Sequence, residues 1–148
     1  EVSTGRDAME GQLILRVVSK FLIPVIMLFS LYVQFHGEYG PGGGFQAGVI
    51  MASALIVHML VFGLDETRKV APIRALRVLS AGGALLYGAV GVLAMLMGGN
   101  FLDYGVLGPS APTGQVIGII AIELGVGITV ASTIVLLAFL FAERVRER

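Results

Sequence analysis

One carboxylate lies inside a long apolar stretch near the end of the chain. Glu123 is the one charged residue between positions 116 and 141, and at 1.5 Å per residue it would lie roughly 12 Å inside a helix. An ionised carboxylate inside a membrane costs at least about 2.5 kcal/mol, so it should face other helices or a wet cavity. A carboxyl that switches between a protonated and a cation-bound form is what a proton or sodium path requires. The alternative is a protonated Glu123 that is hydrogen-bonded across a helix interface.

A histidine, His58, lies in another apolar stretch, at positions 45–64. Histidine titrates near neutral pH and can pass protons, although a single histidine among Val, Leu and Met is also a common packing residue. If the two stretches form antiparallel helices, His58 and Glu123 differ in depth by about 9 Å. Direct contact is therefore not expected, and a relay between them would need water.

Polar residues and glycines fill positions 36–48, HGEYGPGGGFQAG. Three consecutive glycines after Pro41 allow positive φ and hence a sharp turn back into the membrane. The spacing also matches a dinucleotide-binding fingerprint, but no strand precedes it and no βαβ unit follows, so we reject that function. The amides at the start of the next helix could meet an anion or the Glu38 carboxylate, or the segment could be a turn that docks tightly on a neighbouring helix. The candidate residues of this turn are Pro41, Gly42, Gly43, Gly44, Phe45 and Gly48.

Four apolar stretches must position these residues. They cover approximately positions 17–35, 45–64, 78–97 and 116–141, and each reaches the roughly 20 residues that cross about 30 Å of hydrocarbon. Strands are not expected, because the stretches do not alternate and a barrel needs about ten residues per pass. We therefore predict an all-α integral membrane protein with four transmembrane helices, which form a single membrane domain over residues 1–148.

The composition supports a membrane location and excludes several function classes. Hydrophobic residues make up 56% of the chain and charged residues 14%, with a mean hydropathy of +0.90, whereas soluble domains carry about 25% charged residues. The formal net charge is zero, so nucleic acid is not an expected partner. The lack of cysteine excludes disulfides, thiolate metal sites and cysteine nucleophiles. The sequence has no nucleophile–base pair or metal-ligand cluster, so we expect neither an enzyme nor a bound cofactor or metal.

The ten basic residues predict the orientation of the chain. They lie in the N-terminal segment, in the connection between the second and third stretches and in the C-terminal tail, while the other two connections have none. Because cytoplasmic loops carry the excess of Lys and Arg, both termini should be cytoplasmic. The first stretch is too long for a signal peptide and is expected to stay as an anchor. Residues 1–16 are expected to be a polar lead-in, and positions 98–115, rich in Gly and Pro, predict a turn-rich loop rather than a helix.

Small residues at four-residue spacing occur in several of the predicted helices. Such spacing lets helix backbones approach closely, which membrane helices need because lipid supplies no hydrophobic drive between them. Ser30 and Gln34, four residues apart, are expected to bond to a neighbouring helix. The small residues that we expect at helix contacts include Ala52, Gly88 and Gly125.

The chain resembles a known family through three segments. PGGGFQAG at 41–48 leads into a membrane helix, HGE at 36–38 precedes it, and IELGVGITV at 122–130 lies in the last helix. These segments are similar to those of the B-type (MnhB) subunit of the Mrp-type (Mnh) multisubunit sodium/proton antiporter. The resemblance covers roughly positions 17–140.

The resemblance implies a small subunit of a complex in the prokaryotic cytoplasmic membrane, which exchanges Na⁺ for H⁺ as an assembly. Its implied partners are large subunits similar to the antiporter-like subunits of respiratory complex I, other small subunits, and the lipid bilayer. On this hypothesis Glu123 carries or stabilises the ion, His36 and Glu38 shape the outer mouth, and His58 is a further candidate for proton passage. Two alternatives remain open: a purely structural subunit, and a related module of a membrane-bound hydrogenase or ferredoxin-linked redox complex.

Overall fold

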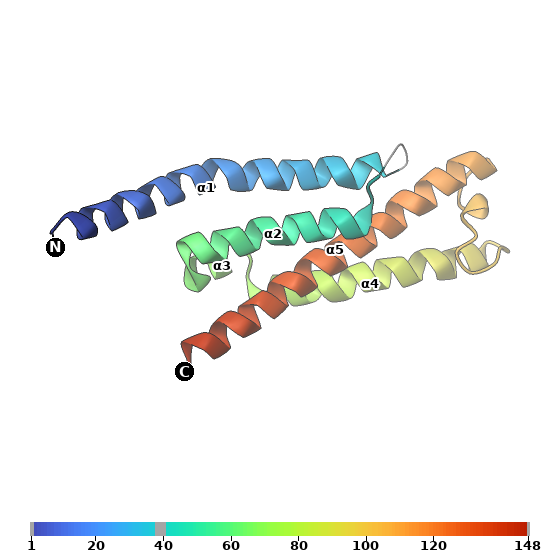
Figure 1. Cartoon of the computed structure of the whole chain (residues 1–148). Helices are drawn as coiled ribbons and strands as arrows, with labels where there is room; N and C mark the ends of the chain where they lie inside the picture. The colour runs from blue at the N-terminus through green and yellow to red at the C-terminus, as the bar shows by residue number, and fades with distance from the viewer. Residues whose placement is uncertain (1, 38–40, 148) are drawn as a thin grey trace.

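The computed structural model describes residues 2–37 and 41–147, with side chains from residue 11 onward. Within these ranges the chain is helical and has no strand (Figure 1). The elements in chain order are α1 (Val2–His36), α2 (Gly44–Phe62), α3 (Leu64–Val70), α4 (Ile73–Leu96), the 3₁₀-helix η1 (Tyr104–Leu107) and α5 (Ala111–Arg146).

Four of these helices are long and apolar enough to cross a membrane, which confirms the predicted all-helical, four-span architecture. The spans are Gly11–His36, Gly44–Phe62, Ile73–Leu96 and Ala111–Arg146. Both chain ends lie at the same end of the bundle (Figure 1). We call this the terminal end, and we call the opposite end, where α1 turns into α2 and α4 leads to α5, the loop end.

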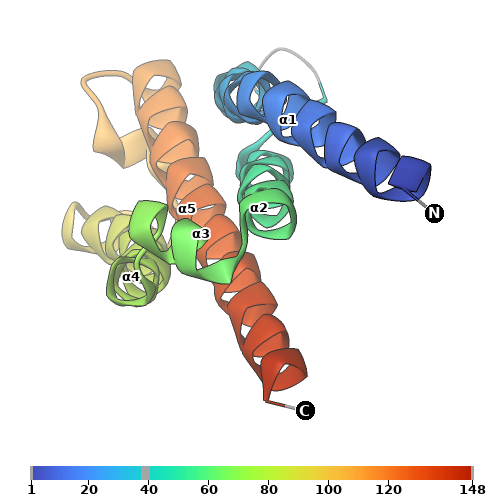
Figure 2. The same ribbon diagram turned by 90° about the vertical axis from the view of Figure 1, so that its left-hand side faces the viewer.

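Helix α5 is the central element of the bundle, with α2 on one side and α4 on the other, while α1 packs on α2 (Figure 2). Small residues and hydroxyls form these contacts. Ser30 Oγ on α1 donates to the carbonyl of Ala47 on α2 at 2.8 Å, which is the bond to a neighbouring helix that was expected for Ser30. Ser80 Oγ and Thr133 Oγ1 lie 2.8 Å apart between α4 and α5. Direct hydrogen bonds of this kind and close backbone approach stabilise membrane helix pairs.

The helix ends differ from the predicted boundaries for local reasons. Helix α1 continues back to Val2, so the polar lead-in extends the first span as one helix. Helix α5 begins at Ala111 with a proline in its first turn, a position that costs no helical hydrogen bond. Helix α2 ends at Phe62 because Gly63 adopts a φ of 96°, which favours glycine.

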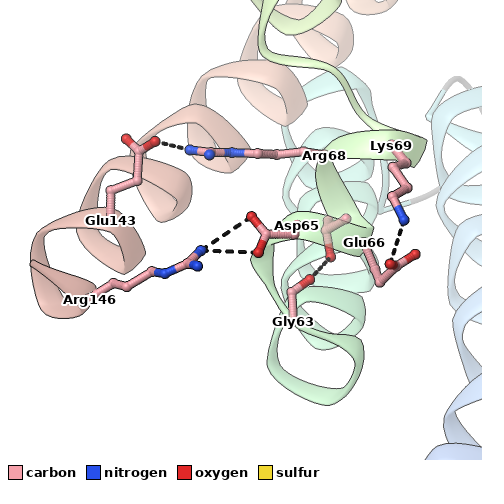
Figure 3. Close-up of polar contacts among 8 residues, drawn as sticks. Gly63, Asp65, Glu66, Arg68, Lys69, Glu143 and Arg146 are labelled. Carbon is pink, nitrogen blue, oxygen red and sulfur yellow. Dashed lines mark hydrogen bonds and ion pairs between the residues drawn. The ribbon is translucent and has the colours of Figure 1, made fainter.

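The connection between α2 and α4 holds α3, a short helix that the sequence did not lead us to expect. Acidic Asp65 and Glu66 occupy its first turn and basic Arg68 and Lys69 its last turn, which is the arrangement that the helix dipole favours. Two ion pairs join α3 to α5 (Figure 3): Arg68 with Glu143, and Arg146 Nη1 with Asp65 Oδ2 at 3.0 Å. Helix α3 is therefore attached to the last turns of α5.

The α4–α5 connection was expected to lack helical structure, and it contains the one-turn helix η1. Its aromatic side chains rest on glycines of the spans, because the ring of Phe101 occupies the space beside Gly91 and the ring of Tyr104 the space beside Gly118. Burial, together with the nearby Tyr87, raises the pKa of Tyr104 above its usual value. The connection is thus packed onto the loop end.

Candidate functional site

The Glu123 carboxylate lies against the backbone that links α1 to α2. A Cβ placed on Gly37 would be 3.0 Å from Glu123 Oε1 and 3.1 Å from Oε2, and a Cβ placed on Gly43 would be 3.1 Å from Oε1. The two glycines flank the carboxylate, one just after the end of α1 and the other just before the start of α2. Side chains at these positions would occupy the space that the carboxylate fills.

Glu123 lies far from the start of its own helix but level with the turn between two neighbouring helices. Helix α5 extends beyond the α1–α2 connection at the loop end (Figure 1). Glu123 therefore lies well inside α5 and at the same level as the turn between α1 and α2. Because α5 begins at Ala111, Glu123 lies 12 residues into the helix (123 − 111) rather than about eight, so the expected depth of roughly 12 Å becomes about 18 Å.

The PGGG turn, residues 41–44, gives α5 an unusually close neighbour. A Cβ on Gly44 would lie 2.9 Å from Cα of Glu123 and would overlap its carbonyl oxygen. Gly43 has a φ of 133° and donates its N–H to the carbonyl of Val33 at 3.3 Å, so it needs the freedom of glycine. One turn further along α2, a Cβ on Gly48 would lie 2.7 Å from the carbonyl oxygen of Gly127. The turn and the start of α2 therefore pack closely against α5.

The site places a carboxylate at the amino end of a helix. Gly43 precedes α2 and supplies no side-chain cap, so the first amides of α2 have no internal partner. The positive end of the helix dipole favours negative charge. The arrangement can therefore hold Glu123 as an anion beside the turn.

The other sequence-predicted residues of the turn lie at the same end. His36 is the last residue of α1, and its ring stacks on Tyr32 with 4.9 Å between ring centroids. It directly precedes Gly37, the residue that touches the Glu123 carboxylate. Pro41 and Phe45 are exposed, while Gly42 approaches the backbone of α1, where a Cβ would lie 2.8 Å from the carbonyl oxygen of Val33. Glu38, the remaining candidate, lies outside the described residues.

His58 lies at the terminal end, and the structure does not bring it to Glu123. Its Nδ1 is 2.8 Å from Thr67 Oγ1, and that hydroxyl donates to the carbonyl of Gly63 at 2.9 Å. The Thr67 hydroxyl has one proton and donates it to Gly63, so it accepts a hydrogen bond from His58 Nδ1–H. Thr67, which lies on α3 and is fully buried, was not among the predicted residues, because only a prediction of α3 would have placed it near His58.

A cavity of about 240 Å³ lies between the two ends of the bundle. Its lining is mostly apolar, but it includes the buried side chains of Ser30, Gln34 and Ser132. Gln34 Oε1 is 2.6 Å from the position of a Cβ on Gly127, one turn of α5 from Glu123. The cavity thus approaches the carboxylate from the side of Gln34, whereas towards the terminal end the bundle is closed by a core that includes Leu76, Val135 and Phe139.

The three small residues expected at helix contacts have different surroundings. Ala52 is fully buried in the core. Gly125 packs on α4, since a Cβ there would lie 2.8 Å from the carbonyl oxygen of Gly83. Gly88 has open space beside it, because a Cβ would meet no described atom within 4 Å. Its small size is therefore not required by a contact within the described part of the chain.

The candidate residues described above lie within the part of the chain that matches a known protein family. A family profile described as a domain related to the MnhB subunit of Na⁺/H⁺ antiporters matches residues 14–136. Proteins assigned the name antiporter subunit mnhB2, from Staphylococcus aureus strains Newman, JH1 and NCTC 8325, are each 36% identical to the chain over 94 residues. The aligned stretch covers 64% of this chain and 66% of the length of each relative.

Proposed function

The chain belongs to the family of domains related to the MnhB subunit of Na⁺/H⁺ antiporters, and we propose that it is the B-type subunit of a multisubunit cation/proton antiporter. The observation that carries the proposal is the family match over residues 14–136, which includes most of all four spans. It is a multi-pass membrane protein and a transporter component rather than an enzyme. The proposed location is the cytoplasmic membrane of a prokaryotic cell, and the proposed partners are the large and small membrane subunits of the same complex.

Within this complex, Glu123 is the residue that we assign to cation or proton passage. An intramembrane carboxylate is costly and is therefore a functional candidate by default. Its position beside Gly37 and Gly43 supports the assignment, because it puts a half-buried carboxylate next to the backbone of these two glycines. His36, next to Gly37, would stand at the mouth of this site.

A structural role is the second candidate, and one contact favours it. The backbones of Gly44 and Glu123 touch, so the same residues that would serve an ion also hold α2 against α5. A subunit of this kind would transport nothing itself and would keep larger subunits in place. Loss of antiport with an intact complex supports passage at Glu123, whereas loss of the complex itself supports the structural role.

The orientation that we propose puts the terminal end in the cytoplasm. The basic residues whose side chains the structure describes lie on α1 before residue 21, on α3, in the first turns of α4 and in the last turn of α5, and Lys and Arg concentrate on the cytoplasmic side. Because the chain lacks cysteine, Asn100→Cys and Glu147→Cys can each be labelled without background. A membrane-impermeant maleimide on intact cells should label the cysteine at position 100 and spare the one at position 147. The reverse pattern would overturn the orientation.

The function itself is tested by identifying the subunits that surround the chain. Mass spectrometry of the gently solubilised native complex should find antiporter-type membrane subunits together with this chain. If hydrogenase or ferredoxin-linked subunits are found in the same complex, the chain belongs to a redox-coupled complex and the antiporter proposal is wrong. Deletion of the gene should also abolish Na⁺-dependent proton movement in membrane vesicles, and its unchanged rate would contradict the proposal.

A further inference from the structure

A second cleft, of about 340 Å³, opens at the terminal end between α1, α2 and α3. It lies far along the bundle from Glu123 and takes no part in the site described above. Three charged side chains line it, Lys20 from α1 and Glu66 and Lys69 from α3, together with His58 from α2. The remaining lining is apolar and includes Ile23, Pro24, Phe62 and Val70.

The cleft lies where the uncharged part of the bundle ends. Lys20 is the last charged residue of α1, and none follows it before His36. Across the cleft, α3 carries four charges within its seven residues. Lys20 is exposed, and within the described residues it has no ion-pair partner. A lysine at the edge of an apolar span reaches towards the level of the lipid headgroups.

The charge of the cleft is positive. Glu66 Oε1 is 2.6 Å from Lys69 Nζ, so this carboxylate neutralises one ammonium group and leaves the other without compensation. Figure 3 shows that Lys69 and Glu66 project from α3 towards α1, whereas Arg68 projects the other way, to Glu143 on α5. Arg68 therefore does not add to the charge of the cleft, which is a net single positive charge from Lys20 and Lys69 against Glu66.

His58 adds a second polar feature to the same wall. Its Nδ1 is taken by Thr67, so Nε2 is the ring nitrogen left for a ligand in the cleft. In the neutral ring with Nδ1–H this nitrogen is an acceptor, which suits a headgroup hydroxyl rather than the phosphate. An anion between Lys20 and Lys69 would then have two ammonium groups beside it, with apolar side chains on the remaining sides.

We propose that this cleft binds the headgroup phosphate of an anionic phospholipid. The phosphate would lie between Lys20 and Lys69, and an acyl chain would run along Ile23, Pro24 and Phe62. Charge complementarity, the position at the edge of the uncharged span and the apolar wall together fit a lipid better than a free anion. The binding does not depend on ion exchange by the complex, nor on which side of the membrane the terminal end faces.

Native mass spectrometry of the full chain in a neutral detergent tests the proposal. Dioleoylphosphatidylglycerol should form one-to-one adducts at a concentration about tenfold lower than dioleoylphosphatidylcholine, and the double variant Lys20→Gln with Lys69→Gln should remove that difference. Arg16→Gln is the matched control, since it removes a basic residue one turn earlier on α1 that does not line the cleft. It should leave the preference unchanged.

A variant that adds positive charge separates lipid binding from a folding defect. Glu66→Gln removes the one carboxylate of the cleft and should strengthen the phosphatidylglycerol adduct several-fold. Equal binding of both lipids by the unaltered chain, or an unchanged preference in the double lysine variant, would overturn the proposal. Displacement of phosphatidylglycerol by an equal concentration of inorganic phosphate would also overturn it, because the site would then recognise a free anion rather than a lipid.

Discussion

The carboxylate of Glu123 lies beside Gly43, one residue before the start of α2: a Cβ on Gly43 would be 3.1 Å from Oε1. The one charged residue in the apolar part of α5 and the glycine turn are therefore parts of a single site. A larger side chain at Gly37 or Gly43 would therefore be tight against the carboxylate, and Gly43 also has a φ of 133° that favours glycine. A substitution in the turn should therefore alter the position of the Glu123 side chain, and a substitution of Glu123 should alter the packing of the turn.

Gly44→Ala should destabilise the chain, because its Cβ would overlap the Glu123 backbone, which cannot rotate away. Overpacking of this kind costs about 1–3 kcal/mol. We expect a lower unfolding temperature of the purified chain in detergent and less of it in membranes. Gly82→Ala is the control, since nothing described lies within 4 Å of its Cβ. An unchanged stability of Gly44→Ala would contradict the close contact between α2 and α5.

Gly37→Ala should be partly rescued by shortening Glu123. The added methyl group would lie 3.0 Å from Glu123 Oε1, and a side-chain contact, unlike a backbone one, can be removed by mutation. In a double-mutant cycle with Glu123→Ala, the coupling should be about 0.5–1 kcal/mol in unfolding free energy. The same cycle with Gly44→Ala should give a smaller coupling, because that methyl group meets the backbone of residue 123. Equal couplings would show that Gly37 does not face the carboxylate.

Thr67→Val should destabilise the terminal end more than Thr67→Ser, which keeps the hydroxyl and loses only one buried methyl group, at about 1 kcal/mol. The Thr67 hydroxyl is fully buried and connects His58 Nδ1 to the carbonyl of Gly63, and its loss leaves buried polar groups unpaired, at a cost of about 1–3 kcal/mol. Thermal unfolding of the two variants measures the difference. Similar stability of the valine and serine variants would mean that the hydroxyl makes no useful hydrogen bond.

The two ion pairs between α3 and α5 should differ in their contribution to stability. Arg68 and Glu143 have 28% and 39% of their side chains exposed, and Arg68 also lies 5.8 Å from the centre of the Phe139 ring, whereas Arg146 and Asp65 are 68% and 66% exposed. Arg68→Gln should cost about 1–2 kcal/mol and Arg146→Gln about 0.5 kcal/mol or less. Added salt should weaken the exposed pair more. Equal costs in thermal unfolding would contradict this ranking.

The four spans could be predicted from sequence because the length of an apolar stretch is enough to identify a membrane-spanning helix. The stretches at 45–64 and 78–97 differ from α2 and α4 by a few residues, and the differences follow from Gly63 and Pro72 at the helix boundaries. Helix α3 has only seven residues, too few for a periodic pattern, although Asp65 and Glu66 ahead of Arg68 and Lys69 were a visible sign of it.

The surroundings of Glu123 could not be predicted, because they depend on how far α5 extends past the turn. A depth counted along one helix says nothing about the neighbours at that level. The same reason applies to His58, whose partner Thr67 belongs to the unpredicted α3. Gly125 and Gly88 looked alike in sequence, but only the structure shows that Gly125 faces Gly83 while Gly88 has open space beside it.

Cation/proton exchange by a complex that carries Glu123→Gln is the most direct test of the central claim. The chain should be produced with the full set of its partner subunits, and Na⁺-dependent collapse of the pH gradient should be measured in everted membrane vesicles beside a native gel of the complex. Because glutamine has the same shape but cannot bind a proton or balance a cation, we expect the exchange rate to fall by about tenfold or more with the complex intact, and Glu123→Asp to keep part of it. An unchanged rate in an intact complex would contradict the claim, and so would loss of the complex itself.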